Sequence, residues 1–224
     1  MQGLFTQLVA ESLSEERLGA YRYSGETHFD ALLRYMWNAE LGAALYTPLQ
    51  HLEIALRNAM HQTLASHYGS ALWFDGNCLT KYQTGQVAKA RGKLQPEDHK
   101  RAGKIVAELE FGFWTALFNK SYAASLVPVL LNGAFGNVVK PYRDRGYLAT
   151  ELNEIRKFRN RVFHHEPIWK RLDILRKRYS SIMQLLLWLS PSLFEVARIT
   201  DRFPEVYRQG TAPYKSSLLA LIKD

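Results

Sequence analysis

The segment NEIRKFRNRVFHHEPIW, residues 153–169, has the pattern of an amphipathic helix with a charge inside its apolar face. The apolar positions recur at helical spacing and form one stripe; they are Leu148, Leu152, Ile155 and Val162. Arg159 follows Ile155 by four residues and precedes Val162 by three, so it falls on that stripe. A guanidinium keeps its charge in proteins, and burying it alone is costly. We therefore expect Arg159 to meet a carboxylate, a partner subunit or a ligand phosphate.

A proline predicts where this helix ends. Pro167 keeps the residue before it out of the α conformation, which predicts a helix end near Phe163. The two histidines that follow, His164 and His165, are then expected in the turn. From there they are free to fold back towards Arg159.

The rest of the chain also shows helical patterns, and no segment alternates convincingly as a strand would. The 224 residues are 47% hydrophobic, which is enough for a substantial core. We expect an all-α protein with a single domain over residues 1–224. Residues 1–25 and 190–224 are expected to be peripheral helical segments.

One helix boundary is predicted inside the first third of the chain. In Thr47-Pro48-Leu49-Gln50, the threonine suits an N-cap and the proline suits the first helical position. The sequence therefore predicts one helix that ends near Tyr46 and another that runs from Pro48 to about Tyr68, where Gly69 ends it.

The charge of the chain favours an anionic partner. The net charge is +8 and the pI is near 9.5. Most of the excess lies in one segment, residues 156–178, which we call the basic segment. Its nine basic and two acidic residues give a net charge of +7. The basic ones are Arg156, Lys157, Arg159, Arg161, Lys170, Arg171, Arg176, Lys177 and Arg178.

Cysteine content and apolar runs predict the compartment. The single cysteine, Cys78, excludes an intramolecular disulfide and a cysteine zinc cluster, and is typical of a reducing cytoplasm. The first residues lack the basic start and apolar run of a signal peptide. The longest apolar stretches, 125–135 and 185–189, are too short to span a bilayer. We expect a cytoplasmic protein with no membrane partner.

The predicted helix from Pro48 to about Tyr68 repeats the order arginine, asparagine, then histidine that begins at Arg159, here as Arg57, Asn58 and His61. Glu53, Arg57 and His61 are spaced four apart and share one helical face. Three interpretations stay open: an intrahelical ion pair with a nearby imidazole, a direct catalytic role, or Glu53 as the partner of Arg159.

The side chains around residue 159 favour one kind of chemistry. No HExxH pattern, nucleophile elbow or phosphate loop is present, so we expect neither a metal nor a cofactor. Arg159, Asn160 and a histidine beside a basic surface can cleave RNA. Histidine can take the 2′-hydroxyl proton or protonate the leaving 5′-oxygen, and arginine can hold the phosphate. Two copies across a two-fold axis would supply both an acid and a base, which favours a homodimer.

These residues resemble a known family. Arg159 to His164, RNRVFH, is similar to the R-x4-6-H motif of the HEPN superfamily. The wider RNRVFHHEPIW, LEIALRNAMH with the following YGSALWF, and ELEFGFWTALF resemble the Abi-like (abortive infection) proteins of bacteria. The resemblance assigns the catalytic roles to Arg159, Asn160 and His164. His165 also satisfies the spacing, so the choice between the two histidines stays open.

The resemblance implies a HEPN-like helical bundle with additional helices, dimerising through the motif helices. It implies a metal-independent endoribonuclease that leaves 2′,3′-cyclic phosphate ends on tRNA, mRNA or another RNA. It also implies a role in phage defence or as a toxin, restrained by an antitoxin protein or a small RNA. The expected RNA-binding residues are Arg156, Lys157, Arg161, Lys170, Arg171 and Lys177, and the expected supporting residues are Glu53, Arg57 and His61.

Two alternatives remain. The first is a HEPN-like dimer that binds RNA or a nucleotide without cutting. The second is a structural partner in a defence complex, in which the motif serves only dimerisation. For Arg159 alone, a buried salt bridge that fixes helix packing would be the simpler role.

Overall fold

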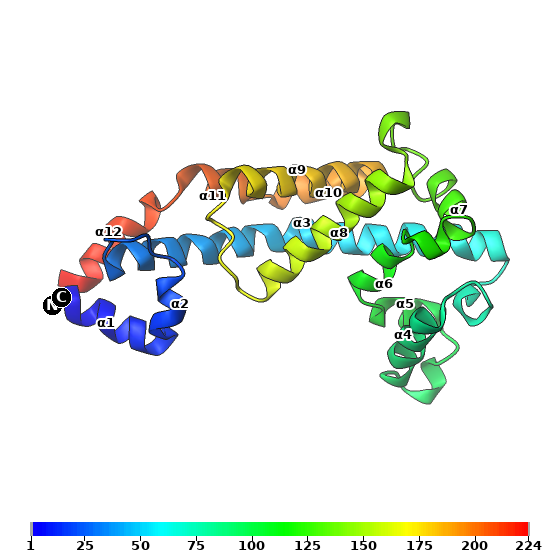
Figure 1. Ribbon diagram of the computed structural model, residues 1–224, viewed down its shortest axis with the longest axis horizontal. Coiled ribbons are helices and arrows are strands. Elements are labelled where there is room, and N and C mark those ends of the chain that lie inside the picture. Colours follow the sequence, from blue (N-terminus) through cyan, green and yellow to red (C-terminus); the bar gives the residue numbers. More distant parts are fainter. Residues whose placement is uncertain (1, 224) are drawn as a thin grey trace. The chain divides into compact units, whose positions relative to one another are not determined.

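The computed structural model describes residues 2–223, and the side chains of residues 5–221 (Figure 1). Within these residues the chain is all-α, as predicted, and contains no strand. The α-helices are α1 (Gln2–Leu13), α2 (Glu15–Gly19), α3 (His28–Tyr68), α4 (Lys81–Gly92), α5 (Ala102–Glu108), α6 (Phe111–Ala116), α7 (Leu126–Asn132), α8 (Arg145–Phe163), α9 (Leu172–Leu189), α10 (Pro191–Thr200), α11 (Phe203–Gln209) and α12 (Ala212–Lys223). Short 3₁₀ turns are η1 (Trp73–Asp75), η2 (Pro96–Asp98), η3 (Lys120–Tyr122) and η4 (Lys140–Tyr142).

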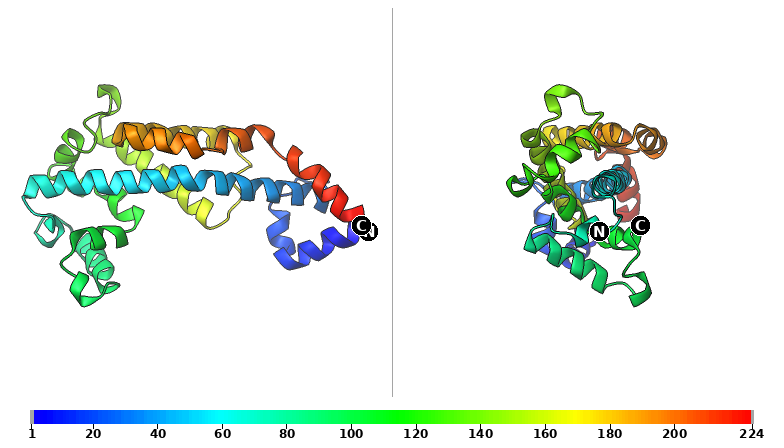
Figure 2. Two further views of the ribbon diagram at one scale, coloured as in Figure 1. Left: turned by 180° about the vertical axis from the view of Figure 1, so that it is seen from behind. Right: turned by 90° about the vertical axis from the view of Figure 1, so that its right-hand side faces the viewer.

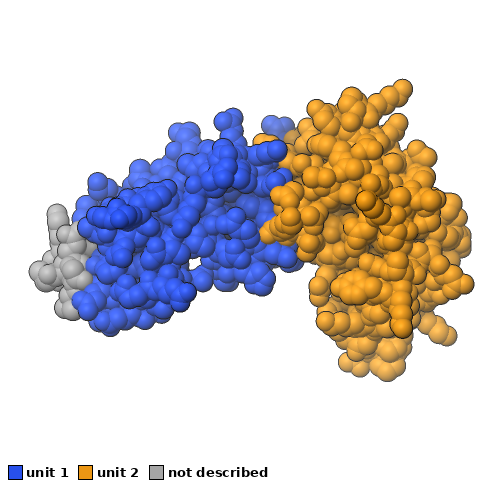
Figure 3. All heavy atoms as spheres, in the orientation of Figure 1, with its two compact units in different colours: residues 1–48, 158–179, 197–224 blue, residues 49–157, 180–196 orange. Residues whose placement is uncertain are grey.

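The chain forms two compact units (Figure 3). Unit 1 comprises Met1–Pro48, Phe158–Tyr179 and Ala197–Asp224, and unit 2 comprises Leu49–Lys157 and Ser180–Val196. The chain passes between the units inside α3, α8, α9 and α10. No crossing is a loop, so the division follows packing and not a linker. Whether the two units behave as the single domain expected from the sequence stays a prediction.

The predicted helix boundary at Pro48 is wrong, because α3 continues through it (Figure 2). A proline inside a helix lacks the N–H that would bond the carbonyl four residues earlier, here Ala44, at a cost of about 3 kcal/mol. Burial offsets that cost. Leu41 and Leu45 are buried in unit 1, and Leu49 is buried in unit 2, at exposures of 0–4%. The local start signal is therefore overridden by the apolar stripe that runs on both sides of it.

The core of unit 1 joins the first part of α3 to the last helices of the chain. Trp37 is 7% exposed, and its indole N–H donates to the carbonyl of Val206 on α11 at 2.9 Å. Tyr179 in the middle of α9 stacks on Phe203, with ring centroids 4.3 Å apart. The segments expected at the periphery thus contribute buried side chains, among them Leu18 at 0% exposure.

The core of unit 2 is aromatic. Trp114 is fully buried, and its ring lies 5.0 Å from Phe113 and 6.4 Å from Trp73, centroid to centroid. Phe74 packs against Trp73 at 5.4 Å. The aromatic residues of α6 therefore form core and not an exposed stacking platform. Among the described residues, no helix has both the length and the hydropathy needed to cross a bilayer.

Candidate functional site

The motif helix α8 ends at Phe163, as the position of Pro167 predicted. The end is a Schellman cap, in which two amide N–H groups reach back to carbonyls of the last turn. The amide of Glu166 donates to the carbonyl of Arg161 at 2.9 Å, and the amide of His165 donates to that of Val162 at 3.0 Å. Residues 164–168, which we call the motif turn, therefore have a defined backbone.

His165 holds the left-handed position of this cap, with φ of 56°. Glycine usually fills that position, and α3 uses it so: Gly69, with φ of 64°, ends that helix in the same way. For a residue with a Cβ the left-handed conformation costs roughly 1–2 kcal/mol. Arg17 helps to hold it, because its Nη2 donates to the carbonyl of His165 at 2.8 Å. Backbone held in an unfavourable conformation is frequent at functional sites.

Arg159 lies against an aromatic ring. Its guanidinium carbon is 4.4 Å from the centroid of the Phe163 ring, and that ring lies 5.9 Å from the ring of Tyr46. A cation over a ring face is stabilised by about 0.5–2 kcal/mol. The charge of Arg159 on the apolar stripe is thus stabilised in part by the aromatic ring of Phe163, a residue of the same helix. Pairing of Arg159 with a carboxylate, a partner subunit or a phosphate stays a prediction.

Both histidines lie in the turn that follows α8, as predicted, but the amide of His164 still makes a helical hydrogen bond. This amide donates to the carbonyl of Asn160 at 2.8 Å, so the backbone of His164 continues the helix, and the reversal begins only at His165. At helical spacing, five residues place His164 about 140° around the axis from Arg159. Both histidines are exposed. Within one chain, helical spacing therefore separates the Cα positions of Arg159 and His164 around the helix axis.

Every fourth residue of the first part of α3 meets the end of α8 or the segment after it. We call these residues, Arg34, Asn38, Gly42 and Tyr46, the α3 stripe. The pairs are Arg34 with Trp169, Asn38 with Glu166 and Ile168, Gly42 with Val162, and Tyr46 with Phe163. These residues and Arg17 were not among the site residues predicted from the sequence. The four-residue spacing of the polar residues Arg34 and Asn38 was the available signal, because it places them on one helical face with Gly42 and Tyr46.

Asn38 fixes the motif turn through both ends of its amide. It is 7% exposed, and its Oδ1 accepts the N–H of Ile168 at 2.7 Å. Its Nδ2 donates to the carbonyl of Glu166 at 3.3 Å and to the hydroxyl of Tyr21 at 3.2 Å. Buried backbone groups need such partners. A single side chain therefore satisfies the backbone on both sides of Pro167.

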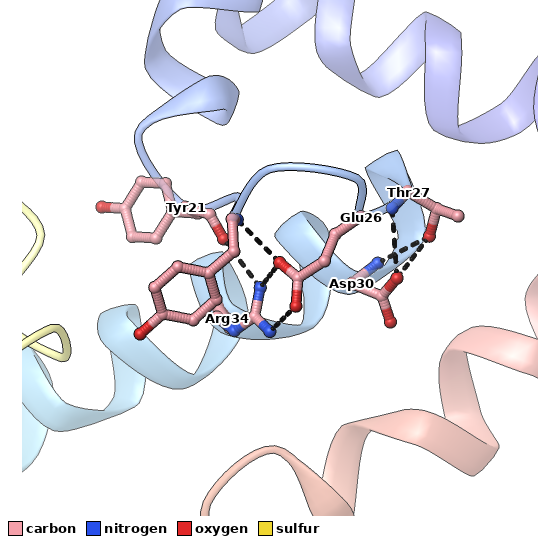
Figure 4. A network of polar contacts seen from close by, with 6 residues as sticks. Tyr21, Glu26, Thr27, Asp30 and Arg34 are labelled. Carbon is pink, nitrogen blue, oxygen red and sulfur yellow. Dashed lines mark hydrogen bonds and ion pairs between the residues drawn. The ribbon is translucent and has the colours of Figure 1, made fainter.

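Arg34 anchors the residues after the turn. Its guanidinium makes two 2.5 Å hydrogen bonds to Glu26 and a third, of 3.2 Å, to the carbonyl of Tyr21 (Figure 4). Its guanidinium carbon also lies 4.8 Å from the ring centroid of Tyr23 and 5.1 Å from that of Trp169. A bidentate, stacked arginine holds a fixed geometry. This pins Trp169, which lies inside the basic segment, to α3.

The predicted RNA-binding residues divide between the two units. In unit 1, Lys170, Arg171 and Lys177 are exposed. Arg171 bonds Asp173 at 3.2 Å, an exposed pair, and the side-chain bond to Asp173 raises the pKa of Arg171. Arg161 is engaged in the motif turn: its Nε donates to Glu166 Oε2 at 3.1 Å and its Nη2 to the carbonyl of Pro167 at 2.6 Å.

The other two of these residues, Arg156 and Lys157, belong to unit 2. Nη2 of Arg156 donates to Asn153 Oδ1 at 2.9 Å, and Lys157 bonds Glu154 at 3.0 Å. Both contacts lie within α8. Within unit 1, Lys170, Arg171 and Lys177 are the exposed residues of this set that do not bond the motif turn.

The residues expected to support the site, Glu53, Arg57 and His61, all lie in unit 2. His61 Nδ1 accepts the indole N–H of Trp73 at 3.1 Å, and burial lowers the pKa of His61. Arg57 donates to the carbonyl of Ala107 at 3.4 Å. These contacts give Arg57 and His61 structural partners within unit 2. Among the described residues, no three His, Cys, Asp or Glu side chains are grouped as a metal site requires.

Comparison with known proteins found no match: no family model, no curated protein and no solved structure matches this chain.

Proposed function

We propose that this protein is a metal-independent endoribonuclease of the HEPN/Abi-like type. The observation that carries the proposal is the arrangement at the end of α8. Arg159 is held against Phe163, Asn160 is adjacent, and two exposed histidines follow on a backbone fixed by Arg17 and Asn38. The proposal also rests on the resemblance of RNRVFHHEPIW to that family.

The reaction we propose uses the 2′-hydroxyl of the RNA as the nucleophile. One imidazole takes the 2′-hydroxyl proton while the 2′-oxygen forms a bond to phosphorus. The bond from phosphorus to the 5′-oxygen breaks, and a second imidazole donates a proton to that oxygen. The products are a 2′,3′-cyclic phosphate and a free 5′-hydroxyl. Arg159 holds the non-bridging oxygens through parallel hydrogen bonds, and the Asn160 amide orients the phosphate.

A homodimer is part of this proposal, for a geometric reason. His164 leaves α8 about 140° around the axis from Arg159, and one chain offers few imidazoles at this point. A second copy packed on the motif helix would supply another imidazole. Two such copies would form a single cleft with two arginines and an acid–base pair of histidines.

The RNA strand is proposed to run over the exposed cations of the basic segment. Lys170, Arg171 and Lys177 lie on unit 1 with Arg159, and phosphate contacts from such residues position a strand without reading its bases. Three further residues would add to the positive electrostatic potential that attracts RNA: Arg156, Lys157 and Arg161. We further propose a role in the cytoplasm as a toxin or in phage defence, with an antitoxin protein or a small RNA as the restraint.

A second candidate function is an RNA-binding dimer that does not cut. The observation that favours it is the angular separation of about 140° between His164 and Arg159 on α8, because an imidazole distant from the guanidinium could bind RNA without catalysing proton transfer. The basic segment would act identically in both cases.

One experiment separates the two. Purified protein is incubated in EDTA with labelled tRNA and with an mRNA fragment, beside Arg159→Ala, His164→Ala and His165→Gly. The glycine suits the left-handed backbone, so it removes the imidazole and keeps the cap. Arg208→Ala, at an exposed position of α11, is the control with the same charge change.

We expect the wild type and Arg208→Ala to cut both RNAs, and Arg159→Ala to lose about 10²–10³-fold in rate. Loss of the acting histidine should cost about 10²–10⁴-fold. A wild type that binds RNA but never cuts it would leave the binding module as the function. Equal losses in Arg159→Ala and Arg208→Ala would mean that only net charge matters.

A further inference from the structure

A hollow of about 650 Å³ lies in unit 1 beside the motif turn. Residues of α2, α3 and the end of α8 line it. Small residues of α3, Ala39, Gly42 and Ala43, line it on one side, and Ala39 and Ala43 are exposed. Pockets of this size accommodate small molecules. The hollow is therefore large enough for one base with its ribose.

The wall of the hollow nearest to α8 consists of two exposed aromatic rings. Tyr46 is 52% exposed and Phe163 is 38% exposed, with centroids 5.9 Å apart. Both line the hollow. RNA-binding proteins commonly stack unpaired bases on aromatic side chains in this manner.

Phe163 links this wall to the proposed catalytic arginine. The Arg159 guanidinium carbon is 4.4 Å from the Phe163 ring centroid, and the same ring lines the hollow. A phosphate held by Arg159 would therefore have an aromatic wall next to it. One nucleotide carries both a phosphate and a base, so a single ligand can use both features.

The rim of the hollow is polar. Arg17, His165 and Glu166 line it, and Arg17 is fixed by its 2.8 Å bond to the carbonyl of His165. These side chains offer donors and an acceptor at the edge of an otherwise apolar space. Base edges present the complementary groups, whereas an apolar helix of another protein does not. Positive charge beside the hollow also favours an anionic ligand such as a nucleic acid over a neutral or basic peptide.

We infer that this hollow is a base-binding subsite, which receives the base of the RNA nucleotide whose phosphate lies on Arg159. This rests on the proposed function in its choice of RNA as the ligand, and it adds that one position of the strand is held by stacking on Tyr46 and Phe163. A second copy of the chain covering the hollow is the competing occupant.

The test is equilibrium binding of a short, fluorescein-labelled 2′-O-methyl RNA, which lacks the 2′-hydroxyl and so reports binding without cleavage. The variants are Tyr46→Ala, Tyr46→Phe and Ala43→Trp, which fills the hollow from the α3 side. Tyr82→Ala, a 71% exposed ring on α4 of unit 2, is the control. Each is measured with the parent RNA and with RNAs that carry one abasic site, at several salt concentrations.

We expect Tyr46→Ala and Ala43→Trp to weaken binding by about 5- to 150-fold, the range for loss of one base–aromatic stack. Tyr46→Phe should bind like the wild type. Because no charge is removed, the slope of log K against log[salt] should not change, whereas Arg159→Ala should lower it by about one phosphate contact. At one RNA position, an abasic site should abolish the effect of Tyr46→Ala.

The inference is overturned if the wild type does not bind the RNA, or if Tyr46→Ala binds as the wild type does. It is also overturned if no abasic position couples to Tyr46. A fall in the mass measured by light scattering, with unchanged RNA affinity, would assign the hollow to a second copy. Binding with the expected coupling in a protein that never cuts RNA would refute only the proposed ribonuclease.

Discussion

Removal of the Asn38 amide should loosen the motif turn, and the size of the effect follows from its three hydrogen bonds. Asn38→Ala leaves the Ile168 N–H, the Glu166 carbonyl and the Tyr21 hydroxyl without this partner. Each such bond contributes about 1 kcal/mol net, so the loss is about 3 kcal/mol. Alanine returns at most about 0.7 kcal/mol in helix propensity. We expect the free energy of unfolding to fall by about 2 kcal/mol.

Urea titration measures this loss, with the midpoint lowered and the slope m unchanged. Asn58→Ala is the matched control, because Asn58 is an exposed residue of the same helix and gains the same propensity. Hydrogen exchange locates the effect: the Ile168 amide should lose protection in Asn38→Ala and keep it in Asn58→Ala. If the two variants have equal stability, or if the Ile168 amide stays protected, Asn38 does not fix the turn.

Two further substitutions each test contacts inside one unit, Arg34 in unit 1 and His61 in unit 2. Arg34→Lys keeps the charge but loses the paired 2.5 Å bonds to Glu26 and the stacking on Tyr23 and Trp169. We therefore expect the free energy of unfolding, measured by thermal denaturation, to fall by about 1–3 kcal/mol. An unchanged midpoint would show that the guanidinium geometry is dispensable. Burial lowers the pKa of His61 below its ordinary value of 6.5, so folding favours the neutral ring and the unfolded chain binds the extra proton. The contribution of the neutral His61 ring to the free energy of unfolding is fully present above pH 6.5 and declines as the pH falls through the folded-state pKa of His61. In His61→Asn, the Oδ1 can still accept the Trp73 indole N–H. When the pH is lowered from about 7.5 to 5.5, the free energy of unfolding should therefore fall less in this variant than in the wild type. Equal decreases in the two proteins would contradict a lowered pKa of His61.

The helix class and the end of α8 could be predicted because both are local. Apolar spacing identifies helices within a few turns, and Pro167 restricts the residue before it whatever the fold. The same locality explains the error at Pro48. A threonine before a proline signals a helix start, but burial of Leu45 and Leu49 on either side keeps α3 continuous.

The clamp on the motif turn could not be derived in this way. Asn38 meets residues 128 and 130 positions later in the chain, and no local pattern announces such a pairing. The backbone hydrogen bond of His164 was also beyond the sequence. Pro167 limits where the helix stops, but it does not choose which residue takes the left-handed position, and the choice of His165 leaves His164 with a helical hydrogen bond.

The proposed reaction requires the 2′-hydroxyl of the RNA to be the nucleophile at the Arg159 site. The most direct measurement compares cleavage, in EDTA, of one RNA with the same RNA carrying a 2′-O-methyl group at the cleaved nucleotide, followed by analysis of the product ends. We expect the unmodified RNA to yield 2′,3′-cyclic phosphate and 5′-hydroxyl ends, and the modified RNA to stay intact. Cleavage of the modified RNA at that nucleotide, or products with 5′-phosphate ends, would contradict the proposed reaction.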